Sequence, residues 1–213
     1  MSRPPVFRPG RRGRNRTRSI GAAVAAVLLA LAGTLLHRYL PSGDRSEAPR
    51  RGSQQQRGEP YTLRGVVSEV ADGDTVTLAT ADGPRKIRLD SIDAPETDHG
   101  PGQPGQPFGE ASRQHLASMV SGRRLSARCF ESDQYGRHVC TLNLEDGSSA
   151  NRAQVSSGHA WAYTARRGAY LRDTEMTRLQ RVAREARQGV WSQPGAIEPW
   201  KWRYDCWRQR QCG

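Results

Sequence analysis

The stretch TLRGVVSEVADGDTVTLATADGPRKIRL, residues 62–89, decides the fold. It contains three runs rich in β-branched and apolar residues, a composition typical of β-strands. The runs are residues 62–70, 75–78 and 86–89. They are separated by Asp72-Gly73 and Asp82-Gly83, and Asp-Gly is a signal for a tight hairpin turn. The sequence therefore predicts that the folded domain opens with a three-stranded antiparallel meander.

Beyond the meander, the chain continues with a loop, helices and a second pair of strands. Residues 97–107 contain three Gly and three Pro, a composition that predicts a loop. Apolar residues at helical spacing predict three helices, and two further runs are typical of strands. The helices are expected over residues 108–120, 150–157 and 176–186, and the strands over residues 125–130 and 138–144. Five strands and three helices predict an α+β domain built on a five-stranded β-barrel of the OB type.

Most of the positive charge of this 213-residue chain lies in its N-terminal part. The chain carries a formal charge of +12, of which residues 1–59 contribute +9 and residues 60–213 only +3. Bulk charge is therefore weak evidence for a polyanionic partner of the folded domain. An argument about function has to rest on particular residues.

The N-terminus has the pattern of an export signal. Residues 1–19 contain seven Arg and no acidic residue, and residues 20–36 form an uncharged, largely apolar run. A basic segment before an apolar one keeps its basic end in the cytoplasm. We favour an uncleaved signal anchor within residues 20–40, because apolar residues continue beyond the small-residue cleavage site Ala-Leu-Ala at 30–32. The alternatives are a signal peptide cleaved at that site and a buried core helix.

Either export pathway places the rest of the chain outside the cytoplasm. The expected location is the cell membrane, held through residues 20–40, or a secreted or periplasmic form after cleavage. Residues 41–60 are polar and rich in Pro, Gly, Ser, Gln and Arg, which predicts a disordered linker. The folded domain is expected over residues 61–192, and a C-terminal extension with aromatic residues and two cysteines over residues 193–213.

The four cysteines suit an oxidising compartment. Cys129 and Cys140 flank a turn-like stretch between two predicted strands, and would face each other if those strands pair. Cys206 and Cys212 lie in the C-terminal extension. We favour the disulfides 129–140 and 206–212 among the three pairings that four cysteines allow. A zinc site is the alternative, but the spacings lack the CxxC pairs of common zinc sites.

Three short acidic motifs are the candidates for chemistry: residues 72–75 (DGDT), 93–96 (DAPE) and 133–137 (DQYGR). Each can be explained alone as a turn, because Asp-Gly and Asp near Pro favour turns. Their occurrence in this order, with Arg88 five residues before Asp93, is far more specific than any one of them.

This combination resembles the staphylococcal nuclease family. The resemblance continues through Asn151, the run GHAWAY at residues 158–163 and GVW at residues 189–191, and it covers residues 62–192. It implies a five-stranded OB barrel with three helices, in agreement with the strand and helix pattern. It further implies a calcium-dependent phosphodiester hydrolase, a thermonuclease-like endo- and exonuclease that cleaves DNA and RNA.

The resemblance also implies a metal site. Asp74 and Asp93 would be the carboxylate ligands of one Ca²⁺ ion, and the backbone carbonyl of Ala94 would be a further ligand, where the family carries Thr. Ca²⁺ is a hard cation that takes oxygen ligands in a loose shell that often includes water. Two carboxylates therefore leave room for waters and for a phosphate oxygen of the substrate.

The remaining site residues are assigned by the same resemblance. Glu96 would lie beside the attacking water, and Arg88 and Arg137 would hold the scissile phosphate. Arg suits this role because its planar guanidinium can bond two phosphate oxygens at once. Tyr163, together with Tyr170, would pack near the nucleotide, in a region whose length departs from that of the family.

A catalytically inactive barrel that binds nucleic acid or protein is the main alternative function. The presence of all five ionic site residues argues against it; they are Asp74, Arg88, Asp93, Glu96 and Arg137. A weaker alternative is a surface protein that assembles through the tryptophans of its C-terminal extension. The expected partner is nucleic acid as substrate, with no obligate protein partner and a monomeric chain.

Overall fold

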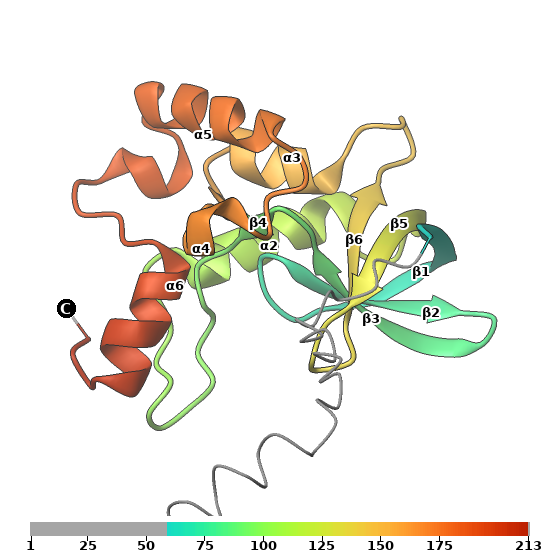
Figure 1. The fold of residues 1–213 in the computed structure, drawn as a ribbon, viewed down its shortest axis with the longest axis horizontal. Helices are drawn as coiled ribbons and strands as arrows, with labels where there is room; N and C mark the ends of the chain where they lie inside the picture. Colours follow the sequence, from blue (N-terminus) through green and yellow to red (C-terminus); the bar gives the residue numbers. More distant parts are fainter. Residues whose placement is uncertain (1–58, 213) are drawn as a thin grey trace, which may run out of the picture. The chain divides into compact units, whose positions relative to one another are not determined.

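The computed structural model describes residues 59–212, in which five strands form a closed barrel (Figure 1). The strands are β1 (Tyr61–Val70), β2 (Thr75–Thr80), β3 (Gly83–Leu89), β5 (Arg124–Ser132) and β6 (His138–Asn143). They follow one another around the barrel in the order β1-β2-β3-β6-β5. The predicted α+β class and five-stranded barrel are confirmed.

The predicted meander consists of β1, β2 and β3, which pair antiparallel in sequence order. β3 then pairs in parallel with β6, and antiparallel pairing of β6 with β5 and of β5 with β1 closes the barrel. Because successive side chains of a strand point to opposite faces, alternate residues of β2 and β3 fill the interior. These are Val76, Leu78, Ile87 and Leu89, each at most 1% exposed.

Helices cover one side of the barrel. The three predicted helices are α2 (Gly109–Val120), α3 (Ala150–Ser156) and α5 (Glu175–Glu185). α2 contributes the buried Leu116 and Val120 to the core of the barrel, and α3 packs against both α2 and α5 (Figure 1). A small antiparallel ladder of β4 (Ile92–Asp93) and β7 (Trp161–Ala162) follows the end of β3. The short helices α4 (Ala165–Gly168) and η1 (Gly189–Ser192) lie on either side of α5 in the sequence.

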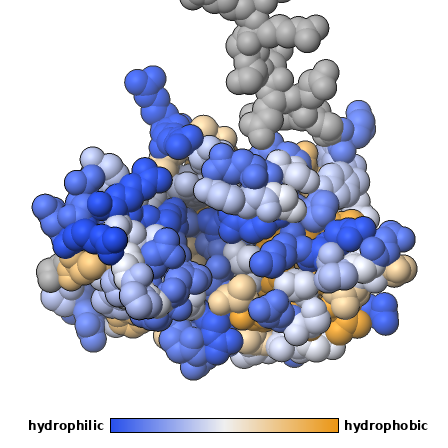
Figure 2. Space-filling model, turned by 90° about the horizontal axis from the view of Figure 1, so that it is seen from below, coloured by the Kyte–Doolittle hydropathy of each residue, from blue (hydrophilic) through white to orange (hydrophobic). Residues whose placement is uncertain are grey.

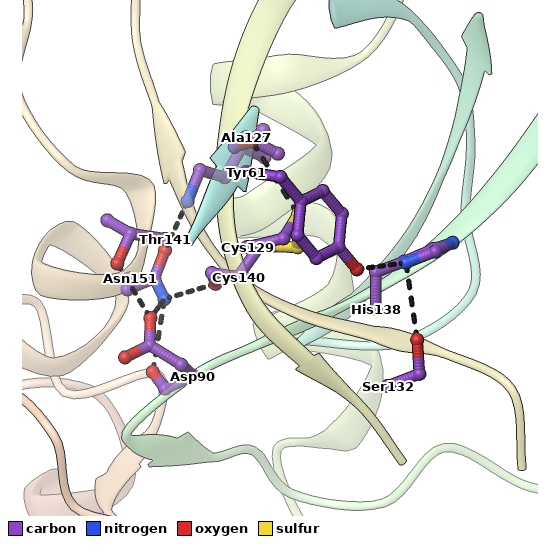
Figure 3. Close-up of a disulfide and its surroundings, with 10 residues drawn as sticks. Tyr61, Asp90, Ala127, Cys129, Ser132, His138, Cys140, Thr141 and Asn151 are labelled. Atoms are coloured by element: carbon purple, nitrogen blue, oxygen red, sulfur yellow. Dashed lines mark hydrogen bonds between the residues drawn. A yellow bond between two sulfur atoms is a disulfide. The ribbon is translucent and has the colours of Figure 1, made fainter. Parts of the chain in front are cut away.

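Both favoured disulfides are present in the structure. Cys129–Cys140 joins β5 to β6, and Cys206–Cys212 closes a short loop near the C-terminus. Figure 3 shows the first of these bonds beside Tyr61, whose hydroxyl lies 2.6 Å from Nδ1 of His138. The strands around the barrel closure are thus linked covalently as well as by their backbone hydrogen bonds.

A buried polar network centred on Asp90 lies next to the Cys129–Cys140 disulfide (Figure 3). The Asp90 carboxylate accepts hydrogen bonds from Thr141 Oγ1 at 2.8 Å and from Asn151 Nδ2 at 2.9 Å. Asn151 Nδ2 also donates to the Cys140 carbonyl, and Asn151 Oδ1 accepts from the Leu142 amide at 3.0 Å. Asn151 therefore ties α3 both to β6 and to the turn that follows β3.

The C-terminal extension folds back against the long loop of residues 97–107 (Figure 1). It contains α6 (Pro199–Trp202) and a short π-helix, η2 (Arg203–Arg208). The indole nitrogens of Trp202 and Trp207 both donate to the Pro104 carbonyl, at 3.2 and 3.0 Å. The extension is therefore anchored on the folded domain at a defined place.

The predicted hydrophobic segment, residues 20–40, lies outside the described residues, and so does the linker up to residue 58. Within residues 59–212, no helix is long and apolar enough to cross a membrane.

Candidate active site

Asp74 is held in a buried position by the turn between β1 and β2. Asp72 Oδ1 accepts a hydrogen bond from the Asp74 amide at 2.9 Å, as in an Asx turn. The Asp74 carboxylate is itself bonded by the Ala94 amide at 2.8 Å and by Thr75 Oγ1 at 3.1 Å. Asp74 is only 4% exposed, and it bonds to the segment that carries the second acidic motif.

Gly73 is required by packing as well as by the turn. A Cβ atom at this position would lie 2.7 Å from Ala94 Cβ and would overlap Ser112 of α2. The Gly73 carbonyl also accepts a hydrogen bond from the buried Gln154 Nε2 at 2.6 Å. The DGDT motif is therefore pressed against α2 and α3, which fixes the backbone just before Asp74.

Arg88 joins the first two acids of the site. Its guanidinium forms an ion pair with Asp74 through one terminal nitrogen and bonds Asp93 Oδ1 at 2.7 Å through the other. Arg88 Nη2 also lies 3.3 Å from the Ile92 carbonyl. The side chain of Asp93 is fully buried and that of Arg88 is 13% exposed. Two carboxylates that are separated in sequence thus meet at a single guanidinium.

Glu96 is connected to this cluster through Arg203. Arg203 Nη1 lies 3.1 Å from Asp93 Oδ1 and forms an ion pair with Glu96 Oε1, and Nη2 lies 2.7 Å from Asp93 Oδ2. Burial raises the pKa of Glu96 above its ordinary value, although the charge of Arg203 opposes this. Burial by itself would lower the pKa of Arg203. The negative charges of Asp93 and Glu96 outweigh this effect, so the pKa of Arg203 is raised.

The donor set of this cluster suits a hard divalent cation. Within residues 59–212, no group of three or more His, Cys, Asp or Glu side chains is arranged to hold a metal ion by itself. The shared contacts of Arg88, however, bring the carboxylates of Asp74 and Asp93 close together. Two carboxylates completed by a backbone carbonyl and waters form the all-oxygen shell that Ca²⁺ accepts.

Arg137 lies apart from these contacts. Its Nε donates to Asp133 Oδ2 at 2.8 Å, within the turn between β5 and β6. No hydrogen bond between Arg137 and the acids of the cluster is found in the described part of the chain. Its positive charge nevertheless acts on Asp72. Burial raises the pKa of Asp72 above its ordinary value, and the charges of Arg88 and Arg137 partly oppose this increase. Arg137 is therefore within electrostatic reach of the DGDT turn without touching it.

Three aromatic rings form a stack beside the cluster. Tyr163 stacks on Tyr170 with ring centroids 5.2 Å apart, and on Trp200 of α6 with centroids 5.5 Å apart. Burial raises the pKa of Tyr163, and the negative charge of Asp93 contributes to the increase. The two tyrosines singled out from the sequence are thus neighbours, and the C-terminal extension adds a third ring.

Comparison with known proteins decides the family. The sequence profile described as "Staphylococcal nuclease homologue" matches residues 86–193. "Protein ParB" of Escherichia coli is 41% identical over 159 residues, which cover 71% of this chain and 85% of that protein. "Micrococcal nuclease" of Shigella flexneri is 36% identical over 149 residues, 66% of this chain and 80% of that protein. An "Uncharacterized endonuclease" of Escherichia coli O157:H7 is 33% identical over 142 residues, 67% of this chain and 86% of that protein.

The chain belongs to the staphylococcal nuclease family.

Within this nuclease-family site, the structure brings together most of the residues singled out from the sequence. Asp74, Arg88, Asp93 and Glu96 form one contiguous network, while Arg137 bonds Asp133 instead. Sequence reasoning gave no role to Arg203, which completes the network. Residue 203 lies beyond the part of the chain that the family profile matches, so motif comparison gave no signal for it.

The surface of this family member is largely polar on the face shown in Figure 2. Hydrophilic residues dominate that view, and hydrophobic residues appear only in limited patches between them.

Proposed function

We propose that the protein is an extracytoplasmic, calcium-dependent nuclease that hydrolyses phosphodiester bonds in DNA and RNA. The observation that carries the proposal is the Arg88 guanidinium, which joins Asp74 and Asp93 in a buried cluster. Relatives named as a micrococcal nuclease and as an endonuclease support the substrate class.

The acids of the cluster would hold the cation. Asp74 and Asp93 supply carboxylate oxygens, and the backbone carbonyl of Ala94 supplies a third oxygen ligand. A bound Ca²⁺ ion neutralises the phosphodiester and stabilises the negative charge that grows during attack. The hydrogen bonds from Thr75 and from the Ala94 amide keep the Asp74 carboxylate in a fixed orientation.

Glu96 is the proposed general base. Burial raises its pKa, which brings a carboxylate closer to the range in which it accepts a proton from water efficiently. Its side chain is 13% exposed, so a water molecule can reach it from the solvent side. Glu96 would orient the attacking water and take up its proton as the water oxygen bonds to phosphorus. The bond from phosphorus to the leaving oxygen would break on the opposite side, and that oxygen would take a proton from solvent.

Two arginines would bind the reacting phosphate. Arg88 lies against the metal-binding acids, where its donors would meet a phosphate oxygen next to the cation. Arg137 bonds Asp133 through Nε, and its terminal nitrogens form no hydrogen bond within residues 59–212, so they would be free to bind a phosphate oxygen. Donors aimed at developing charge contribute about 2.7–4 kcal/mol each to transition-state stabilisation.

The tyrosine pair would contact the nucleotide. Tyr163 and Tyr170 stack beside the acid cluster, and Tyr170 is 40% exposed. Base stacking on aromatic rings tolerates every base, which suits an enzyme that cleaves both DNA and RNA.

Cleavage assays on the full-length protein test the proposal. We expect degradation of single-stranded DNA and RNA with Ca²⁺, and none with a chelator. Asp74→Asn should reduce the rate by roughly a thousandfold, because it removes a charged cation ligand. Asp82→Asn, in the exposed turn between β2 and β3, is the matched control and should cleave at the wild-type rate. Binding of nucleic acid without cleavage at any Ca²⁺ concentration would instead support an inactive barrel.

The extracytoplasmic part of the proposal rests on the basic and apolar segments of residues 1–36. A fusion of residues 1–60 to a reporter enzyme that is active only after export tests it directly. We expect reporter activity, and its loss when charged residues interrupt the apolar run. Activity that is unaffected by the interruption would contradict the proposed location.

A further inference from the structure

We propose that Arg203 is a third arginine of the active site, which positions Glu96 and serves as the counter-ion of Asp93 when no cation is bound. The inference rests on the proposed function for the identity of the cation site. It assigns a catalytic-site role to the C-terminal extension, which the sequence alone connects only with assembly through its tryptophans.

Arg203 makes specific contacts with two acids of the cluster. Its two terminal nitrogens bond both carboxylate oxygens of Asp93, at 3.1 and 2.7 Å, and one of them also pairs with Glu96. The Asp93 side chain is fully buried, whereas that of Arg203 is 29% exposed. Arg203 therefore lies between Asp93 and the solvent, and it links the acid nearest the centre of the cluster to the proposed general base.

The extension holds Arg203 in place from both sides. Trp202, immediately before it, is 7% exposed, and Trp207 follows four residues later. Both indoles donate to the carbonyl of Pro104, and Cys206 between them is buried and disulfide-bonded to Cys212. An arginine fixed between two anchored tryptophans loses little further entropy when it binds the acids. Such a residue can position another side chain.

Charge balance explains why a second guanidinium is needed. The cluster contains three acids, Asp74, Asp93 and Glu96, but Arg88 contacts only the first two. Without Arg203, a buried excess of two negative charges would remain, and neighbouring buried charges of the same sign repel each other. Arg203 reduces the excess to one charge, and its contact with Glu96 keeps that carboxylate beside Asp93.

The same contacts place Arg203 in competition with a divalent cation. Both oxygens of Asp93 accept hydrogen bonds from guanidinium groups, and the positive charge of Arg203 lies beside both of them, where it would repel a cation bound to Asp93. Arg203 is the more exposed of the two arginines and its contact with Glu96 does not depend on Asp93. We therefore expect Arg203 to leave Asp93 on cation binding and to remain on Glu96.

Calorimetric titration of Ca²⁺ into the full-length protein, without nucleic acid, tests the competition. Arg203→Gln should bind Ca²⁺ roughly tenfold more tightly than wild type, because one positive charge near the cation is gone. Lys201→Gln is the matched control: it removes one positive charge from the same extension, where Lys201 pairs with the partly exposed Glu198. Its Ca²⁺ affinity should equal that of wild type within about threefold. An Arg203→Gln affinity no higher than that of wild type would overturn the competition.

Steady-state kinetics test the positioning role. At saturating Ca²⁺, Arg203→Gln should lower kcat by about tenfold or more with a KM within about threefold of wild type. Arg203→Lys keeps the positive charge but lacks the planar guanidinium with its two terminal donors. Its Ca²⁺ affinity should therefore be that of wild type, while its kcat stays reduced. If Arg203→Gln does not fold, Arg203→Lys carries the test, and a wild-type kcat in that variant would overturn the proposal. Wild-type protein that cleaves neither polymer would overturn the proposed function, whereas the cation-binding comparison would still decide the role of Arg203.

Discussion

Arg88 and Asp93 bond to each other at 2.7 Å, although residues five apart in an extended strand point to opposite faces. β3, which carries Arg88, ends at Leu89. Ser91 then takes a positive φ of 63°, which turns the chain before Asp93. The Ser91 hydroxyl accepts hydrogen bonds from the amides of Arg172 and Asp173, each at 2.9 Å, and these fix the turn. The turn lets one strand end supply both the arginine proposed to bind phosphate and the acid proposed to bind the cation.

The fork of Arg88 is expected to be essential. Arg88→Lys keeps the positive charge, but a single ammonium group cannot reproduce the planar contacts to Asp74 and Asp93. We predict a fall in kcat of about 100- to 1000-fold on DNA and RNA oligonucleotides. Arg85→Lys, three residues earlier on β3, is the matched control and should be fully active. An Arg88→Lys rate within threefold of wild type would show that charge alone suffices.

The close packing of Gly73 predicts an effect on both stability and activity. Gly73→Ala places a methyl group against Ala94 and Ser112, so the DGDT turn must shift away from α2. Overpacking of this kind costs about 1–3 kcal/mol of unfolding free energy. We expect that loss in urea unfolding, together with weaker Ca²⁺ binding, because Asp74 follows directly. Ala71→Ser, an exposed position in the same turn, should change neither quantity.

Asn151 is expected to be a structural residue. Asn151→Ala removes hydrogen bonds to Asp90, to the Cys140 carbonyl and to the Leu142 amide, all in a buried site. Unsatisfied buried groups predict a loss of about 2–4 kcal/mol, measured by urea unfolding with the disulfides intact. Asn143→Ala, which removes only a 3.4 Å contact with Ser126, should cost less than about 1 kcal/mol. Equal losses in the two variants would contradict the importance of the Asp90 network.

Stability is expected to fall in mild acid because of His159. Burial, with a contribution from the stacked His115, lowers the pKa of His159 to about 4. An unfolded histidine titrates near pH ~6.5, so below that pH the unfolded chain binds a proton that the folded protein does not. The contribution of the neutral His159 ring to the free energy of unfolding is therefore complete above pH ~6.5. It declines as the pH falls and levels off near the pKa of His159 in the folded protein.

Urea unfolding at pH 7.5 and pH 5 in the presence of chelator measures this effect. The ring is only half-buried, so the expected loss attributable to His159 is about 1–2 kcal/mol. His159→Gln should remove that part of the decline. His99→Gln, at an exposed position in the long loop, should keep the wild-type difference between the two pH values. An unchanged decline in His159→Gln would assign the acid sensitivity to other groups.

Local patterns predicted the barrel and its helices well, because alternation and turn residues act over short distances. The meander of residues 62–89 and the Cys129–Cys140 pairing both follow from neighbouring strands. Gly73 was interpreted only as a turn residue. Its further requirement comes from Ser112 and Ala94, which the fold brings against it from other segments, and no local pattern contains that information.

The site was predictable as far as its motifs reach. Asp74, Arg88, Asp93 and Glu96 lie within motifs whose order identified the family, whereas Arg203 bonds Asp93 across more than a hundred residues of chain. The two tryptophans that flank it in the sequence, Trp202 and Trp207, indicate that this segment packs on the folded domain. The acids that Arg203 contacts could be recognised only once the extension was placed on the loop before α2.

The parallel pairing of β3 with β6 has a consequence for how the chain folds. The strand that carries Arg88 acquires its second neighbour only after α2 and β5 have been made, since Ile87 lies opposite His138. Contacts between such distant residues slow folding, because the entropy of closing the long intervening loop is lost before the contacts stabilise the chain. Until β6 pairs with it, the β3 edge stays open to pairing with another chain, so the strand that carries Arg88 is unprotected during that interval.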